Sequence, residues 1–363
     1  MPELKPALAK WLRDTVWPGR TAFGRAVAAA LRPAAAAYGC AITLRNWAYD
    51  WRLLPSVRAE IGVVSVGNLA VGGTGKTPLT VWLATRLQER GLQVAIVSRG
   101  YGGTAKEPLV VSRGRGPEVN PDHAGDEAVM MARRFAGPVI VARQRAAGVA
   151  LARTLGCTVA VLDDGFQHRA LARDFDLVLL GGRMGALLPA GPLREPYRAL
   201  RRADALALVD KGIGARPLGP PASAAGKPLF WVRMVPECWV ESEGGRWRER
   251  PLRELSGQRV AAVSGVADPS GFYTLLQQWE VQVAEGFEFP DHHRYTTEDW
   301  QRLNRRTQEF DYIVTTEKDL VKLEQFPFAR GKLRALRIAP EIDRADDLLQ
   351  CVVAAVHNRT RTP

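Results

Sequence analysis

The feature that most constrains this chain is a glycine-rich loop between an apolar strand pattern and a helical pattern. The stretch Val63–Val66 predicts a buried strand, and helical spacing follows from Thr77 to Arg90. Between them, residues 72–77 read Gly-Gly-Thr-Gly-Lys-Thr. Glycines in such a loop let backbone N–H groups approach phosphate oxygens, and the N-terminus of the following helix is electropositive. The sequence therefore predicts that this loop binds a nucleoside triphosphate.

Each polar residue of the loop has an expected role. Lys76 is placed to reach the β- and γ-phosphates, and the hydroxyl of Thr77 is placed to bind Mg²⁺. The loop departs from the usual pattern at its first position, where Ala70 replaces a glycine. The predicted nucleotide-binding residues are Gly72, Gly73, Thr74, Gly75, Lys76 and Thr77.

Apolar runs and helical stretches alternate along most of the chain and indicate an α/β fold. The length of 363 residues suggests two domains, and 46% hydrophobic residues suffice for their cores. The predicted strands after the loop are Val94–Val97, Val139–Val141, Val159–Leu162, Leu177–Leu180 and Ala205–Val209. This alternation is typical of a doubly wound, mainly parallel sheet.

A second α/β unit follows a short linker. Residues 212–226 are rich in Gly, Pro and Ala, and Gly244-Gly245 lies between two strand patterns as a hairpin turn would. The strand and helix alternation then begins again after Gly257. The expected divisions are a basic helical segment over 1–60, a nucleotide-binding α/β domain over 61–211, a linker with a β-hairpin over 212–257, and a smaller α/β domain over 258–363.

The N-terminal segment is unusually basic. Residues 1–59 hold nine Lys or Arg and three acids, which is half of the net charge of +12. Apolar residues recur at helical spacing from Leu4 to Val16, and Trp47 and Trp51 form a further pair. Two interpretations stay open: these helices pack on the main domain, or their apolar side chains enter the surface of an anionic membrane.

The sequence shows no pattern typical of a membrane-spanning, secreted or disulfide-stabilised protein. Ala26–Leu44 is interrupted by Arg32 and Pro33, so we expect no transmembrane helix, and no secretory signal is recognisable. The four cysteines show no paired spacing, which argues against a zinc site and a disulfide framework and fits a reducing compartment.

Several titratable residues outside the loop are candidates for chemistry. Asp163 and Asp164 end a predicted buried strand, where a second Mg²⁺-binding acid belongs, although a turn-capping role is also open. Asp126 begins a helix and is either its N-cap or a base that accepts a proton from a hydroxyl. The histidines at 292 and 293 follow Asp291, and an acid–histidine pair can serve as a general base.

Taken together, these motifs resemble the tetraacyldisaccharide 4′-kinases of lipid A biosynthesis. The resemblance extends in order from about residue 61 to 320, and the extended glycine loop and the Asp-Asp-Gly-Phe-Gln-His motif are its most specific parts. The matching motifs are Gly67-Asn68 with Gly72–Thr77, Ser98–Gly102, Gly125–Glu127, Asp163–His168, Gly191–Glu195, Asp291–His293 and Thr316–Asp319.

The resemblance implies two phosphate-loop-type, doubly wound lobes joined by a β-stranded linker. It implies ATP-dependent phosphorylation of the 4′-hydroxyl of a tetraacylated glucosamine disaccharide 1-phosphate, an anionic glycolipid, at the cytoplasmic face of the bacterial inner membrane. It also implies a catalytic Asp126–His292 pair, with His293 as the alternative histidine, and Lys76 to neutralise the transferred phosphoryl group. The candidate Mg²⁺ ligands are Thr77, Asp163 or Asp164, and Glu195, and the candidate substrate ligands are Asn68, Arg145, Gln167, His168 and Arg194.

Two other functions compete with this kinase. A phosphate-loop ATPase or GTPase switch would use water as its acceptor, and Thr316–Asp319 partly matches a guanine-recognition motif. A nucleic-acid-binding module is suggested only by net charge, and no helix-turn-helix, zinc-finger or RNA-binding motif accompanies it. We therefore infer a membrane surface as a partner, no nucleic acid and no obligate protein partner.

Overall fold

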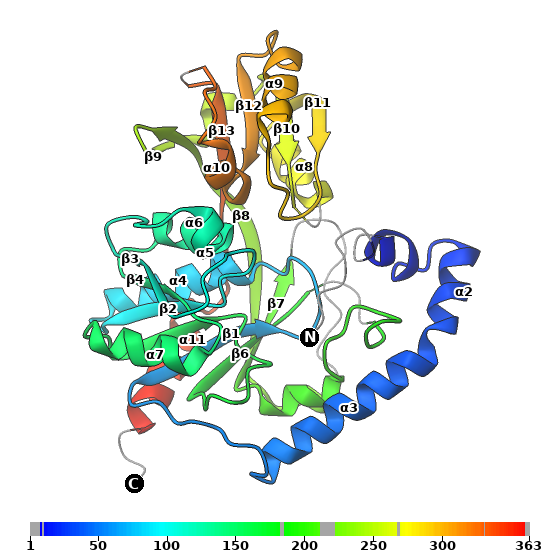
Figure 1. Cartoon of the computed structure of the whole chain (residues 1–363), viewed down its shortest axis with the longest axis vertical. Coiled ribbons are helices and arrows are strands. Elements are labelled where there is room, and N and C mark those ends of the chain that lie inside the picture. The colour runs from blue at the N-terminus through cyan, green and yellow to red at the C-terminus, as the bar shows by residue number, and fades with distance from the viewer. Residues whose placement is uncertain are drawn as a thin grey trace.

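The computed structural model describes residue 8 and residues 11–181, 185–210, 222–266, 269–329 and 331–359 (Figure 1). These residues form two α/β lobes and an N-terminal helical segment. One sheet runs through both lobes, with the strand order β11-β10-β12-β13-β8-β7-β6-β1-β5-β2-β4-β3 and with β9 paired to β8. The expected mixed α/β fold is confirmed.

The first lobe carries the glycine-rich loop at the end of its central strand. Every residue of β1 is buried, as expected for a strand covered on both faces. Its strands are β1 (Gly62–Asn68), β2 (Val94–Ser98), β4 (Pro138–Val141), β5 (Val159–Asp163), β6 (Phe175–Leu180) and β7 (Ala205–Asp210), which are parallel, and the antiparallel edge strand β3 (Leu109–Arg113).

Helices cover both faces of this part of the sheet. On one face, α4 (Lys76–Glu89) and α6 (Asp126–Arg134) pack on Val64 and Val66 of β1. On the other face, α7 (Arg145–Thr154) packs on Val63. This two-sided cover is the doubly wound arrangement that the alternating pattern predicts. The short helices of the lobe are α5 (Pro121–Ala124), η2 (Tyr197–Arg202) and η3 (Ala222–Ala224).

The second lobe repeats the layered arrangement on a smaller scale. Leucines of α9 and α10 bury one face of its sheet, and Phe272, Leu275 and Leu276 of α8 bury the other. Its elements are η4 (Leu252–Leu255), β10 (Arg259–Ser264), α8 (Pro269–Gln278), β11 (Gln282–Glu288), α9 (Thr297–Arg306), β12 (Tyr312–Thr316), α10 (Glu317–Leu323) and β13 (Leu333–Ile342). At the start of α9, Thr296 and Asp299 form a capping box.

Two long strands connect the lobes. β8 (Leu229–Glu243) pairs in parallel with β7 of the first lobe through its beginning and antiparallel with β13 along most of its length. Gly244 and Gly245, both with positive φ, turn the chain into β9 (Arg246–Arg250), as the hairpin prediction expected. Residues 212–221 of the predicted linker lie outside the described residues.

The C-terminal helix departs from the predicted division of the chain. α11 (Ala345–Asn358) belongs to the expected 258–363 domain, but it packs on the first lobe. Leu348, Leu349 and Val352 join the same core as Val64 and Leu79. After β13 the chain thus returns to the first lobe. There the apolar side chains of α11 are buried against the sheet and α4.

The N-terminal segment lies along the outer side of the first lobe, where Figure 1 shows α2 and α3 in blue. It contains a π-helical turn (Leu12–Val16), α2 (Ala22–Ala30) and α3 (Arg32–Asp50). No single helix of the described residues is long and apolar enough to cross a membrane, although α2 and α3, bent by 46°, would pass that test as a pair.

We expect Leu348→Ala to lower the free energy of unfolding by about 2–5 kcal/mol, because it leaves a cavity under α11. Leu44→Ala is the matched control, because Leu44 is 67% exposed on α3. Denaturant unfolding of the two variants measures the difference. Equal stability of the two variants would contradict the packing of α11 on the first lobe.

Candidate active site

The glycine-rich loop runs from β1 to the first turn of α4. Gly75 precedes α4 with φ of 81°, a left-handed conformation that glycine adopts without strain. Side chains at Gly72 or Gly73 would meet no heavy atom within 4 Å, so the loop is open on that side. The loop thus has open space beside Gly72 and Gly73, whereas Met234 of β8 packs closely against Gly75 at the N-terminus of α4.

Lys76 is held at this loop by two oxygen atoms. Its Nζ lies 3.3 Å from Oδ1 of Asn68 and 3.7 Å from Oδ1 of Asp164. Asn68 in turn donates from Nδ2 to Oγ1 of Thr74 at 2.8 Å. Both ends of the Asn68 amide are thus used within the loop, where they position Lys76. This geometry gives Asn68 a different role from the predicted contact with substrate.

Asp163 and Asp164 lie beside Lys76 but in different environments. Asp163 is buried at the end of β5 and accepts a hydrogen bond from the hydroxyl of Thr80 at 3.1 Å. Asp164 has a φ of 54° and accepts two hydrogen bonds from Arg194, at 2.8 and 3.0 Å. A non-glycine residue in the left-handed region is uncommon and often marks a functional site.

The pKa values of the two carboxyl groups shift in opposite directions. Burial and the nearby carboxylates of Glu127 and Asp164 raise the pKa of Asp163 from 3.8 to about 7. For Asp164, burial raises the pKa, but the charges of Lys76 and Arg194 outweigh burial and lower it. The neutral carboxyl is thus favoured at Asp163, whereas the neighbouring cations favour the carboxylate at Asp164.

The predicted substrate ligands surround these acids. Arg194 reaches Asp164, and Gln167 donates to the backbone carbonyl of Asn68 at 2.8 Å. Arg145 is buried and donates to the backbone carbonyl of Ala142 at 2.8 Å. Burial and nearby arginines lower the pKa of His168 to about 4, so its ring is neutral near pH 7.

Glu195 does not join this group. Its carboxylate is buried and its Oε2 is bound by Nδ2 of Asn46 at 2.8 Å and by Arg202 at 3.0 Å. Arg194 thus faces Asp164, while the neighbouring Glu195 faces Asn46 of α3. The expectation that Glu195 binds metal has no support in these contacts. The described residues contain no group of three His, Cys, Asp or Glu side chains placed to hold a metal ion.

Asp126 and His292 meet where the two lobes face each other. Nδ1 of His292 lies 3.2 Å from both carboxylate oxygens of Asp126, across 166 residues of sequence. Gly125, not Asp126, is the N-cap of α6, so the capping interpretation of Asp126 is wrong. A side chain at Gly125 would lie 2.4 Å from the carbonyl oxygen of Tyr101, which explains the glycine before Asp126.

Two lysines of the second lobe complete the surroundings of Asp126. Nζ of Lys322 lies 3.5 Å from Asp126, and Lys318 is 3.2 Å from the neighbouring Glu127. Burial raises the pKa of Asp126, but the hydrogen bond with His292 and the charges of Lys318 and Lys322 outweigh burial and hold that pKa far below its ordinary value. Asp126 is therefore an ionised carboxylate at neutral pH.

The two neighbouring histidines have separate partners. His293 bonds through Nε2 to Asp299 at 2.9 Å, and its ring stacks on Phe289. His292, whose φ is 59°, bonds to Asp126 and contacts the ring of Tyr101. Of the two histidines left open by the sequence, the structure brings His292 to Asp126.

Sequence reasoning did not identify Glu127, Lys318 or Lys322 as part of the site. Glu127 and Lys318 stand in the recognised Gly-Asp-Glu and Thr-Glu-Lys-Asp motifs. Lys322 is one helical turn after Lys318, and that i, i+4 spacing was the available signal. Thr316 caps α10 by accepting from the backbone N–H of Asp319, so this motif begins the helix that carries Lys318 and Lys322.

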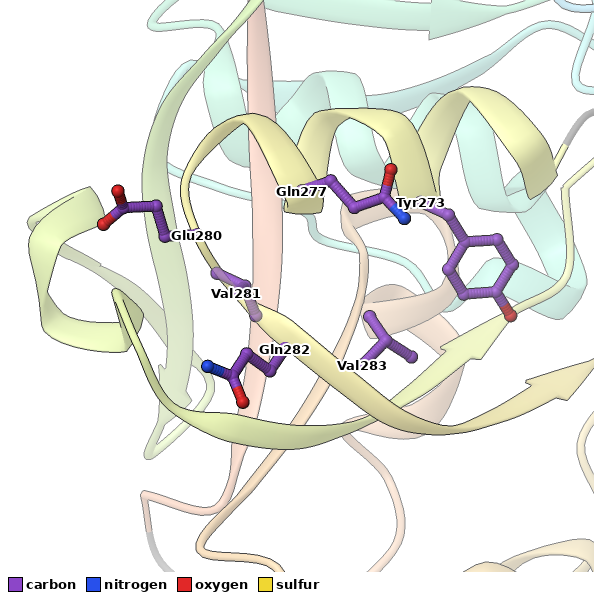
Figure 2. A pocket seen from close by; sticks show the side chains of 6 residues that line it. All are labelled: Tyr273, Gln277, Glu280, Val281, Gln282 and Val283. Atoms are coloured by element: carbon purple, nitrogen blue, oxygen red, sulfur yellow. The ribbon is translucent and has the colours of Figure 1, made fainter.

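A hollow of about 420 Å³ lies elsewhere in the second lobe, between α8 and β11. Figure 2 shows its lining, which contains none of the predicted site residues: Tyr273, Gln277, Glu280, Val281, Gln282 and Val283.

Comparison with known proteins shows to which family the chain belongs. The profile of the tetraacyldisaccharide-1-P 4'-kinase family matches residues 27–357. The chain belongs to this family. It is 40% identical over 362 residues to a tetraacyldisaccharide 4'-kinase of Anaeromyxobacter dehalogenans, covering 95% of this chain and 94% of the relative. A tetraacyldisaccharide 4'-kinase of Methylobacillus flagellatus is 37% identical over 93% of this chain and 94% of its own length.

A solved structure is similar over nearly the whole chain. The crystal structure of the "apo" form of LpxK from Aquifex aeolicus in complex with ATP superposes with a TM-score of 0.78 at 34% sequence identity. The similarity covers 91% of this chain and 99% of that chain. The family resemblance of the sequence motifs is confirmed.

We expect Asp163→Asn to stabilise the nucleotide-free protein at about pH 8. The raised pKa means that the folded state favours the protonated carboxyl of Asp163. Its contribution to the free energy of unfolding is fully present below pH 3.8 and is lost as the pH rises to about 7. The asparagine removes this loss, and its advantage should shrink toward about pH 4. Melting temperatures across this pH range measure the effect.

Asp164→Asn is the matched control and should act in the opposite direction. The pKa of Asp164 is lowered, so its charged form stabilises the folded state above the ordinary Asp range. Stabilisation by both substitutions, or by neither, would contradict the different environments of the two carboxyl groups.

Proposed function

We propose that this protein is a kinase that transfers the terminal phosphoryl group of ATP to the 4′-hydroxyl of a tetraacylated glucosamine disaccharide 1-phosphate. The observation that carries the proposal is the contact of Asp126 with His292 across the two lobes. The Lys76 loop belongs to the same site, because the charge of Glu127, next to Asp126, acts on Asp163, whose neighbour Asp164 contacts Lys76. A switch ATPase has no need for such a pair, whereas a kinase needs a group that orients an acceptor hydroxyl.

The proposed transfer uses Asp126 as the proton acceptor. The 4′-hydroxyl donates a hydrogen bond to the Asp126 carboxylate, and its oxygen forms a bond to the γ-phosphorus of ATP. The bond from that phosphorus to the bridging oxygen of the β-phosphate breaks, ADP leaves, and the hydroxyl proton ends on Asp126. Its lowered pKa makes the Asp126 carboxylate a weak base, so its main contribution is to orient the hydroxyl, and positioning provides most of the rate enhancement in such reactions.

The loop residues would bind and neutralise the phosphates. Backbone N–H groups of Gly72–Lys76 would bind phosphate oxygens, and the ammonium group of Lys76, 3.7 Å from Asp164, would add positive charge. We further propose that Mg²⁺ binds Thr77 and one of the two strand-end acids, Asp163 or Asp164. Mg²⁺ commonly takes one or two carboxylates together with phosphate oxygens, and it would neutralise charge on the β- and γ-phosphates.

The proposed acceptor site is built from the loop that follows β5, the segment that precedes η2 and the first residue of α7. Arg194 and Arg145 supply positive charge for an anionic glycolipid, and the neutral His168 ring can hydrogen-bond a sugar hydroxyl. Arg45 of α3 also donates to the backbone carbonyl of Gln167 at 3.2 Å, so the N-terminal segment contributes to this surface.

We propose that α3 also places the protein on the cytoplasmic face of the inner membrane. This helix buries Ala35, Gly39 and Asn46 against the first lobe. Leu44 and Trp47 of the helix are instead exposed, and Trp47 stacks with Trp51, the C-cap residue, at a ring-centroid distance of 5.7 Å, while Trp51 is 69% exposed. Exposed tryptophans beside arginines suit the interface of an anionic bilayer.

The kinase assay uses γ-labelled ATP, Mg²⁺ and the tetraacyl disaccharide 1-phosphate. We expect label in the lipid fraction, and we expect Asp126→Asn to lower the transfer rate by about a hundredfold or more while ATP binding is retained. Lys76→Ala should abolish transfer, because it removes the ammonium group that lies beside Asn68 and Asp164 at the loop.

Asp122→Asn provides the control for Asp126→Asn, because Asp122 is exposed on α5 four residues earlier. This variant should transfer phosphate at the wild-type rate. Phosphate release without lipid labelling would overturn the acceptor and favour a switch ATPase. Near-normal transfer by Asp126→Asn would remove Asp126 from the base role.

Membrane binding has its own test. We expect the double substitution Trp47→Ser and Trp51→Ser to weaken partitioning onto vesicles that contain phosphatidylglycerol by at least about tenfold, because each buried apolar side chain contributes about 1.5–3 kcal/mol. Trp231→Ser, at an exposed tryptophan of β8, is the control and should leave partitioning unchanged. Equal partitioning of all three proteins would move the membrane contact away from α3.

A further inference from the structure

Both ring nitrogens of His292 have a partner in the structure. Nδ1 lies 3.2 Å from the Asp126 carboxylate, and Nε2 lies 3.1 Å from Nζ of Lys318. Asp291 is more distant from Nε2, at 3.9 Å. The imidazole is thus held between a carboxylate on one side and an amino group on the other.

The chemistry of the two partners determines where the imidazole proton lies. A lysine ammonium has three donor hydrogens and no acceptor, so Nε2 must accept from Lys318 and carries no hydrogen itself. The proton of the neutral ring is then on Nδ1, which donates to Asp126. The opposite tautomer would turn an Nδ1 lone pair toward a carboxylate and an N–H group toward an ammonium.

Each of the three hydrogens of the Lys318 ammonium group has an acceptor. Its remaining hydrogens have partners in Oδ1 of Asp291 at 2.9 Å and Oε1 of Glu127 at 3.2 Å. Burial lowers the pKa of Lys318, but the charges of Glu127, Asp126 and Asp291 outweigh burial and raise it above its ordinary value. Three acceptors therefore surround three donors.

The helix that carries Lys318 is itself fixed. Glu317 is buried and pairs with Arg134 of α6 at 3.0 Å and with Arg337 of β13 at 2.7 Å. Thr316 caps the first turn of α10. The backbone at position 318 is therefore held between the two lobes, and Nζ of Lys318 has little freedom to leave Nε2.

We propose that Lys318 is a positioning residue that fixes His292 in its Nδ1–H tautomer and thereby keeps the Asp126 carboxylate aimed at the acceptor hydroxyl. The inference rests on the proposed kinase function for its catalytic meaning. With Nε2 occupied and Nδ1 donating, His292 orients the carboxylate and leaves proton acceptance to Asp126. A lysine that served only as an ion-pair partner of Glu127 would have no effect on the imidazole tautomer.

The tautomer can be measured without turnover. We would label the histidines of the full chain with ¹⁵N, record two-bond ¹H–¹⁵N correlations at about pH 8, where an ordinary histidine is neutral, and assign His292 from the spectrum of His292→Asn. The wild-type ring should show a protonated Nδ1 and an acceptor Nε2. A protonated Nε2 in the wild-type protein would overturn the proposal, whatever any variant does.

The variants separate the tautomer from general disruption. Lys318→Met should mix the two tautomers and lower kcat by up to about a hundredfold, the effect of misplacing a catalytic group by about 1 Å, without changing KM for ATP. Lys318→Arg retains a donor and should restore the wild-type tautomer and part of kcat. Lys322→Met is the matched control one turn later, because Lys322 contacts Asp126 and not the imidazole. It should leave the tautomer unchanged.

The outcomes distinguish this proposal from the proposed function. An unchanged tautomer in Lys318→Met, or the same tautomer change in Lys322→Met, would overturn the role of Lys318. A wild-type protein that shows the Nδ1–H tautomer but labels no lipid would overturn the kinase proposal and leave the assignment of the tautomer intact.

Discussion

Opposite charges on α6 and α10 determine where the two lobes of this protein meet. Asp126 and Glu127 in the first turn of α6 face Lys322 and Lys318, and the basic last turn of α6 faces Glu317 and Glu324. Acids at the N-terminus and bases at the C-terminus also suit the dipole of α6. These ion pairs are largely buried, so removing one partner would leave a buried charge without compensation. The pairs between α6 and α10 therefore favour one alignment of the lobes. The contact of Asp126 with His292 depends on that alignment.

Local parts of the site could be predicted from the sequence because short segments specify them. The loop from Gly72 to Thr77 needs only the strand before it and the helix after it, and both lie where the apolar spacing places them. The hairpin at Gly244 and the capping box at Thr296 are equally local. In each case, the residues that make the contact are only a few positions apart.

Contacts between distant segments were less accessible to sequence reasoning. The resemblance to the family, and no spacing rule, suggested that Asp126 faces a histidine 166 residues away. Adjacent residues also separated in ways that the sequence does not reveal: Arg194 reaches Asp164, whereas Glu195 is bound by Asn46 of α3. Likewise, the place of α11 on the first lobe depends on which surface the rest of the fold leaves uncovered.

The position of α3 has a consequence for the geometry of catalysis at a bilayer. One side of this helix holds the acceptor loops through the bonds of Tyr38 to the carbonyl of Arg194 and of Arg45 to that of Gln167, while Leu44 and Trp47 project from it to the solvent. In the proposed orientation, a single helix diameter of about 10 Å separates the acyl region from the loops that would hold the sugar. The acyl chains would then stay in the membrane throughout turnover, and only the headgroup would need to rise to the enzyme.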